Sequence, residues 1–432
     1  MPETNSCLIP YGRGLHSVRL PEGASVCRIE PAFPPPRANA GAIIRDALDN
    51  PIGSPTLREL AKGKRTAVIL VPGKDRVAAI SDALPALLNE LNAGGIPDEG
   101  ISVVLATGSH VKHSPADVLQ ILGEDAARRV PWRQHVCGPG AHLEFLGSTQ
   151  RGTPVELDRQ SIRADLRVLT GRILPHYFAG FGGGRKALVP GIASFKTILA
   201  NHRLTLASKA GIHPRVSTCS LAGNPVHLDM VEAARMAGPA FVFNTLLDTQ
   251  HRLVHAVAGE LEAAHLAGCR QAEAWHQVEL PEAVDAVVTS AGGWPYDCDF
   301  VQALKAIFNI SGIVRSGGSV LWMAQCHEGM KESFLKWAGI RSQAELERAA
   351  RENYNLSAHN TILLRRLTGR ARVALWSDLP DDAVRALGLE PVHTPEHGMA
   401  WLGDACRRGG RCAVAPCGNI TFATAPNQPT GT

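Results

Sequence analysis

Apolar and amphipathic stretches alternate along the first two thirds of the chain. Four short, mainly apolar runs stand at residues 66–71, 101–106, 166–170 and 241–245. An amphipathic stretch at 76–92 separates the first two runs. Strands that are apolar on both faces are typical of parallel sheets covered by helices on both sides. The pattern therefore predicts that residues 1–278 form an α/β domain with a largely parallel sheet.

A second alternation begins after residue 280. Strands are predicted at 286–289, 319–323 and 372–376, and helices at 299–313, 331–338, 343–352, 359–368 and 380–387. Residues 279–422 are therefore predicted to form a second, smaller α/β domain, and the polar residues 423–432 a disordered tail. In open α/β sheets, ligands bind where loops leave the carboxyl ends of strands. We expect the active site on such loops, in the cleft between the two domains.

Composition and charge narrow the classes of partner. The 432 residues carry a net charge of only +4, and Lys and Arg form no continuous stripe, so no nucleic-acid partner is expected. No apolar run is long enough to cross a bilayer, so no membrane partner is expected either. The ten cysteines form no C-x-x-C pair and the N-terminus has no secretory signal. Reduced thiols in a cytoplasmic protein are therefore expected.

The first candidate for chemistry is the segment Leu105-Ala106-Thr107-Gly108-Ser109-His110, with His113 close behind. It follows a predicted strand and precedes a helix that starts near Ser114-Pro115. Histidine titrates near neutral pH, so His110 could serve as an acid or a base. Taken alone, however, the segment fits a surface-loop histidine better.

The densest candidate is the glycine-rich segment 174–186. Gly182, Gly183 and Gly184 precede Arg185 and Lys186, a combination that lets backbone N–H groups and cations approach an anion. Neither G-x-x-x-x-G-K-[ST] nor G-x-G-x-x-G is matched. The spacing favours a phosphate or anion site over a purely structural glycine bend.

Histidines at positions 110, 176 and 202 accompany these segments. Together with Lys186 they suggest a metal site or an acid/base constellation. Their spacing fits no short zinc motif, so spacing alone identifies no metal.

A third candidate opens the second domain. The segment 290–297 has two glycines after a predicted strand, and Gln302 and Lys305 lie three residues apart on the next helix. That separation puts both side chains on one helical face. A solvent-facing pair is the alternative.

Together these segments resemble the lactate racemase family of nickel-pincer enzymes. The long pattern PHxFAGxxGGRKxxxPGIxxxxTIxxNH runs from Pro175 to His202. The segments 106–110 (ATGSH), 223–227 (GNPVH) and 290–305 (SAGGWPYD, then Gln302 and Lys305) match further family signatures. The resemblance covers roughly residues 65–390, most of the chain.

The resemblance implies a cofactor and a role for each matching residue. The family holds nickel in pyridinium-3,5-bisthiocarboxylic acid mononucleotide, joined covalently to a lysine that corresponds to Lys186. The nickel-binding histidine corresponds to His202, and sulfur with imidazole is a ligand set that suits nickel. Proteins that synthesise the cofactor would be transient partners. The other cofactor contacts fall on Gly182, Gly183, Gly184, Arg185 and Arg76.

The implied reaction is racemisation or epimerisation of a 2-hydroxy acid. The hydrogen at C2 is a very weak acid, so hydride transfer to the cofactor through a 2-oxo acid avoids costly deprotonation. His110 and His176 would act as the two acid/base groups, one for each configuration. Gln302, Lys305 and Arg76 would bind the substrate and hold its carboxylate.

Departures from the family pattern leave alternatives open. The usual D-x-T-R-P is Gly73-Lys74-Asp75-Arg76-Val77 here, and an aromatic residue beside the glutamine is Val301. The segment 357–360 also differs from the lactate-specific form. We therefore expect a substrate that is lactate-like or larger, such as a sugar acid. The alternatives are a pincer-dependent redox enzyme with net dehydrogenation or dehydration, a non-catalytic cofactor- or nickel-binding protein, and a pyridoxal-phosphate racemase that uses Lys186.

Overall fold

The computed structural model describes residues 6–20, 24–35, 39–110, 112–406 and 410–428. The first of its two large sheets has the order β13-β12-β9-β4-β5-β6. These strands are β4 (Ala67–Val71), β5 (Ile101–Leu105), β6 (Trp132–Gln134), β9 (Leu166–Arg172), β12 (Ala240–Leu247) and β13 (Leu253–Glu260). All neighbours are parallel except β12 and β13. The predicted, largely parallel sheet is confirmed.

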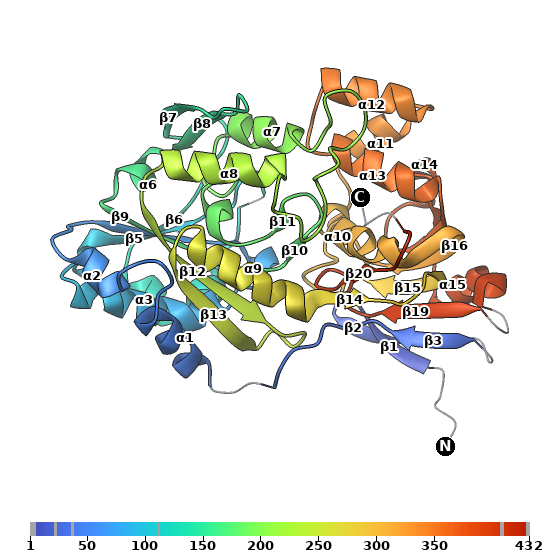
Figure 1. The fold of residues 1–432 in the computed structure, drawn as a ribbon, viewed down its shortest axis with the longest axis horizontal. Helices are drawn as coiled ribbons and strands as arrows, with labels where there is room; N and C mark the ends of the chain where they lie inside the picture. The colour runs from blue at the N-terminus through green and yellow to red at the C-terminus, as the bar shows by residue number, and fades with distance from the viewer. Residues whose placement is uncertain (1–5, 21–23, 36–38, 111, 407–409, 429–432) are drawn as a thin grey trace.

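Helices cover both faces of this sheet (Figure 1). One face packs α1 (Ala40–Asp49), α2 (Leu57–Ala61) and α3 (Ile80–Ala93) against residues such as Ile69, Val103 and Phe241. The other face packs α7 (Phe195–Arg203) and α8 (Pro225–Met236) against Leu70 and Leu169. The smaller elements are α4 (Pro115–Leu122), α5 (Glu124–Arg129), β7 (Leu143–Ser148), β8 (Pro154–Asp158), α6 (Arg159–Arg163) and α9 (Ala263–His276).

The second sheet is entirely parallel, in the order β18-β17-β16-β15-β19-β3. Its strands are β3 (Ser25–Arg28), β15 (Val284–Ser290), β16 (Val314–Met323), β17 (Arg372–Trp376), β18 (Glu390–Val392) and β19 (Arg411–Ala415). One face is covered by α10 (Phe300–Ile310) and α13 (Ala358–Thr368). The other face is covered by α15 (Pro395–Leu402) and the hairpin of β1 (Ser6–Tyr11) and β2 (Gly14–Arg19). The remaining helices are α11 (Ser333–Ala338), α12 (Gln343–Glu352) and α14 (Asp381–Ala386).

Two of the predicted boundaries differ from the structure. The first domain was expected to begin at residue 1, but β3 pairs with β19 in the second sheet, and Figure 1 shows β3 beside β19. The tail was expected to begin at residue 423, but Ala423 is buried in β20 (Phe422–Thr424), which pairs with β14 (Gln277–Glu279). Both strands depend on partners far away in the sequence. Residues 429–432 of the expected tail lie outside the described residues.

The described part of the chain bears on two further expectations. No helix within it is both long and apolar enough to span a membrane. Eight cysteines have free thiols, but Cys412 forms a disulfide bond, so the expectation of reduced thiols throughout is wrong at this position.

The loops that leave the carboxyl ends of both sheets meet. One continuous cluster of buried apolar side chains runs from Val68 and Leu169 of the first sheet to Val320 of the second. Arg172, at the end of β9, donates a 2.6 Å hydrogen bond to the Tyr296 hydroxyl, in the loop after β15. The two halves are thereby joined where the active site was expected.

Candidate active site

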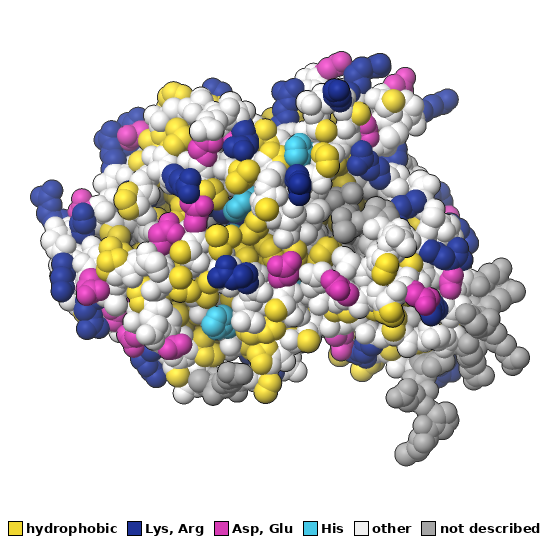
Figure 2. Space-filling model, in the orientation of Figure 1, with side chains coloured by type: hydrophobic (Ala, Val, Ile, Leu, Met, Phe, Trp, Pro, Cys, Tyr) yellow, Lys and Arg dark blue, Asp and Glu magenta, His cyan; other side chains and the backbone are white. Residues whose placement is uncertain are grey.

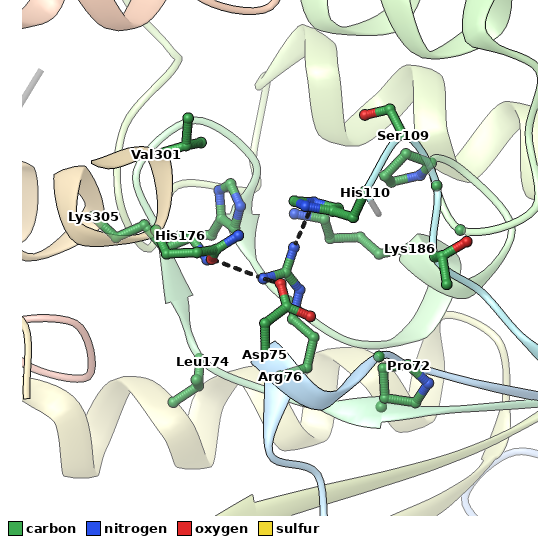
Figure 3. A pocket seen from close by; sticks show the side chains of 18 of the residues that line it. Pro72, Asp75, Arg76, Ser109, His110, Leu174, His176, Lys186, Val301 and Lys305 are labelled. Carbon is green, nitrogen blue, oxygen red and sulfur yellow. Dashed lines mark hydrogen bonds and ion pairs between the residues drawn. The ribbon is translucent and has the colours of Figure 1, made fainter. Parts of the chain in front are cut away.

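A pocket lies between the loops of the two sheets (Figure 3). Arg76 follows β4, His110 follows β5, and His176 lies in the short strand β10 (Pro175–His176) after β9. The other predicted side chains in its lining are Lys186, His202, Gln302 and Lys305. Seven predicted site residues from both halves of the chain therefore share one pocket. In space-filling view, acidic and basic side chains are interspersed over the face shown (Figure 2).

Arg76 is the centre of the polar contacts in this pocket. Its Nη1 donates to Asp75 Oδ2 at 2.7 Å and to Gln302 Oε1 at 3.0 Å. Its Nη2 lies 3.3 Å from His110 Nε2, as the dashed line in Figure 3 marks. Because a guanidinium can only donate, this contact makes His110 Nε2 an acceptor. Burial opposes ionisation of Asp75, but the neighbouring charge of Arg76 outweighs it and lowers the pKa of this carboxyl.

Lys305 shares its acceptor with Arg76. Its Nζ donates to the same Gln302 Oε1, which lies on the helix α10 together with Lys305. Burial and the nearby charge of Arg76 lower the pKa of Lys305 from 10.5 to about 7. The predicted helical face carrying Gln302 and Lys305 is confirmed, and it points into the pocket rather than to bulk solvent. An anion that entered here would find two cations close together.

Both candidate acid/base histidines are neutral in this environment. Burial lowers the pKa of His110 to about 4, against the opposing charge of Asp75. Burial and then the charge of Lys186 hold the pKa of His176 well below its ordinary value. His176 Nδ1 accepts a weak 3.4 Å hydrogen bond from the backbone of Ala179, which leaves Nε2 for the pocket. A neutral imidazole is the form that can accept a proton.

Lys186 and His202 meet the chemical requirements for holding the implied cofactor. Burial and the charge of Arg185 hold the pKa of Lys186 well below its ordinary value, which favours the nucleophilic amine form over the ammonium form. Its Nζ lies 5.4 Å from the centre of the Phe178 ring, without an acidic partner among the described residues. In the described chain, the only group of three side chains that could bind a metal is Cys298, Asp299 and Glu328. His202 lines the pocket, and its imidazole nitrogen is a ligand that suits nickel.

Only part of the glycine-rich loop lines the pocket. Gly182 and Gly183 line the pocket, whereas Gly184 and Arg185 do not. A side chain at Gly184 would start 2.8 Å from the ring of His265, so packing against α9 explains this glycine. The Arg185 guanidinium is buried against the Ala179 carbonyl and His265. The predicted anion contacts of Gly184 and Arg185 are thus replaced by contacts inside the protein.

Sequence reasoning missed the side chains that support this pocket from behind. The Tyr177 hydroxyl donates a 2.6 Å hydrogen bond to Asn360 Oδ1, which ties the loop of His176 to α13. Asn224 caps α8 and also donates to the Phe178 carbonyl at 3.0 Å. The GNPVH segment contained the signal for this cap, because Asn followed by Pro commonly begins a helix. No local signal paired Tyr177 with Asn360.

The sequence and the fold are both similar to those of known proteins. A sequence model of the family "Lactate racemase N-terminal domain" matches residues 11–213. The lactate racemase of Thermoanaerobacterium thermosaccharolyticum is 34% identical over 339 residues, 76% of each chain. The lactate racemase of Lactiplantibacillus plantarum is 34% identical over 286 residues, 66% of each chain.

Two solved structures resemble the whole fold. The lactate racemase apoprotein from Thermoanaerobacterium thermosaccharolyticum superimposes with a TM-score of 0.86 at 28% identity, covering 97% of this chain and 99% of the other. A protein from Thermotoga maritima has a TM-score of 0.67 at 18% identity, covering 87% and 100%. The second likeness concerns the fold alone.

Proposed function

This chain belongs to the lactate racemase family and is an isomerase, and we propose that it interconverts the configurations at C2 of a 2-hydroxy acid with a nickel-pincer cofactor. The observation that carries the proposal is one pocket that holds two neutral imidazoles, His110 and His176, beside two cations, Arg76 and Lys305. The first pair can move a proton, and the second pair can hold a carboxylate.

In this proposal the two histidines serve opposite configurations of the substrate. One imidazole accepts the proton of the 2-hydroxyl, and the other returns a proton when the opposite configuration is formed. His110 is prepared as an acceptor because Arg76 already donates to its Nε2. A substrate hydroxyl replaces that contact when Arg76 turns toward the carboxylate. His110 and His176 come from different loops, so they can approach the substrate from different sides.

Lys305 and Arg76 would orient the substrate by its carboxylate. Both side chains already donate a hydrogen bond to Gln302 Oε1. This amide oxygen is shared by the two cations, but it carries no full negative charge and therefore neutralises neither of them. A bound carboxylate supplies the missing negative charge and limits rotation about the bond from C1 to C2.

The cofactor would be held by Lys186 and His202. The amine of Lys186, whose pKa is held below its ordinary value, suits a covalent link to one arm of the pyridinium mononucleotide, and His202 suits nickel. When bound, this group supplies reversible hydride acceptance, so that C2 need not lose a proton. Proteins that build the cofactor are the partners this proposal requires.

Replacement of each histidine tests the proposal. We expect His110→Ala and His176→Ala each to lose roughly 10²–10⁴-fold of the racemisation rate, the usual contribution of a positioned acid or base. Chiral chromatography follows the reaction, and intact mass with nickel analysis checks that both variants still carry the cofactor. His393→Ala, at an exposed histidine, is the control and should keep full activity.

Each contrary result has a distinct meaning. Full activity in either variant would remove that histidine from the acid/base pair. Loaded protein that consumes the hydroxy acid without forming its mirror image would support a redox enzyme instead. Wild-type protein that stays unmodified and nickel-free, from a host that loads a known family member, would overturn the cofactor.

A further inference from the structure

Two of the departures from the family motif after β4, Gly73 and Asp75, fall in one part of the pocket lining. Gly73, Asp75 and His113 all line it, and we call these three residues the Gly73 corner. A side chain at position 73 would start 2.3 Å from His113 Nε2 and 3.2 Å from Asp75 Oδ1. Because Gly73 has no side chain, His113 Nε2 and Asp75 Oδ1 can both lie around the position that a Cβ atom would occupy.

Among the described residues, both polar atoms of the corner lack a hydrogen-bond partner. His113 Nε2 is buried and has no hydrogen bond from the residues that the structure describes. Within the same residues, the hydrogen bond that Asp75 accepts comes from Arg76 and goes to Oδ2, which leaves Oδ1 without one. Buried polar groups are nearly always paired, so the corner is suited to a ligand with a hydrogen-bonding group.

The charges of the pocket limit what that ligand can be. Arg76 and Lys305 converge on Gln302 Oε1, and Asp75 already pairs with Arg76 at 2.7 Å. Two cations and one anion give a net charge of one positive unit, which one substrate carboxylate neutralises. A second carboxylate near the corner would face Asp75 where little solvent screens the repulsion. Lys331 also lines the pocket, but it is exposed, so its attraction for a second carboxylate is screened.

A hydroxyl fits the same place. It can donate to Asp75 Oδ1 while its oxygen faces His113, whereas a methyl group would leave the carboxylate oxygen unpaired. The short side chain of Val301, beside Gln302, leaves space for a longer substrate. We infer that Asp75 is a specificity-determining residue that selects 2-hydroxy acids with one carboxylate and a hydroxyl at C3. The inference rests on the proposed function and names its substrate class.

Three acids separate these effects. Glycerate differs from lactate by one hydroxyl at C3, and malate carries a second carboxylate. For loaded wild-type protein, kcat/KM for glycerate should exceed that for lactate and malate by roughly 10-fold or more. Asp75→Asn removes the charge but keeps an acceptor, so it should raise the ratio of malate to glycerate by roughly 10-fold.

Two further variants control the comparison. Asp75→Thr restores the residue type of the family motif, so it tests the corner if Asp75→Asn does not fold. Thr lacks the charge and should also relieve the discrimination against malate. Asp82→Asn, at an exposed aspartate on α3, should leave all three ratios unchanged.

The outcomes separate this inference from the proposed function. Equal kcat/KM for glycerate and lactate, with a malate ratio that neither Asp75 variant changes, would overturn the role of Asp75. If wild-type protein racemises none of the acids, the proposed function fails. Titration calorimetry of the apoprotein then still tests the corner, since glycerate should bind more tightly than lactate or malate only while Asp75 is present.

Discussion

The charge of the Lys305 side chain depends strongly on its surroundings in the pocket. Its pKa of about 7 lies well below that of a lysine in water, because burial and Arg76 disfavour the ammonium form. A bound carboxylate favours the ammonium form, so binding above pH 7 requires uptake of a proton. Affinity for the substrate is therefore greatest below pH 7 and falls as the pH rises through that value.

We expect the Kd of a 2-hydroxy acid to increase by roughly tenfold per pH unit above pH 7. Lys305→Gln should bind weakly and without this slope. Calorimetry in buffers of different ionisation enthalpy measures both Kd and proton uptake. Lys331→Gln removes an exposed lysine of the same lining and should keep the slope. The same slope in Lys305→Gln would assign the proton to another group.

Single residues were predictable where a motif fixed both their type and their place after a strand. His110, His176 and Lys186 follow β5 and β9, and the pocket brings them together as expected. Arg185 follows the same glycines, yet its guanidinium is engaged by His265 on α9, 80 residues away. Its direction depends on which helix packs behind the loop, and the local sequence does not encode that.

At the scale of elements, α10 links helix capping to the site. The Asp299 side chain accepts a 2.9 Å hydrogen bond from the backbone N–H of Gln302 and so begins the helix that presents Gln302 and Lys305. Without this cap, a backbone N–H group of the first turn would lack its hydrogen-bond acceptor, and the part of the helix that reaches the pocket would be less firmly held.

We expect Asp299→Ala to lower the free energy of unfolding by about 0.5–2 kcal/mol, and Asp299→Asn to keep most of it, because Asn also caps helices. Denaturant titration measures both. Ser342→Ala removes the equivalent cap of α12, which lies away from the pocket lining. It should lose similar stability while substrate affinity stays constant, whereas Asp299→Ala should also weaken binding. If Asn destabilises as much as Ala, the carboxylate acts by its charge and not as a cap.

Most elements were predictable because their periodicity is local. The predicted helix at 343–352 and strand at 372–376 coincide with α12 and β17. The predicted helix 299–313 ends at Ile310 and continues as a tight 3-10 turn over 311–313. The pairing of β3 with β19 joins residues almost 400 positions apart, and no periodic pattern in the sequence indicates which distant strand will be the partner.

At the scale of the molecule, residues 6–20 and 24–28 complete the second half of the fold. The β1–β2 hairpin covers one face of the second sheet with Ile9, Val18 and Leu20, while β3 closes the edge beside β19. An open edge and an uncovered apolar face would otherwise favour aggregation. The chain then crosses to α1 and builds the first sheet before it returns to the second, so the second half is not made from one continuous segment.

Neighbouring residues of β1 test this arrangement. Ile9 is fully buried against the second sheet, whereas Leu8 is 57% exposed. We expect Ile9→Ala to lose about 2–5 kcal/mol of unfolding free energy, because it removes apolar contacts and leaves a cavity. Leu8→Ala, the same kind of change on the outer face, should stay within about 0.5 kcal/mol of wild type. Equal stability of the two variants, measured by denaturant unfolding, would mean that the hairpin is not part of this core. A loss confined to Ile9→Ala, with one cooperative transition retained, would mean that the N-terminal hairpin unfolds together with the second sheet, against which the helix of Gln302 and Lys305 packs.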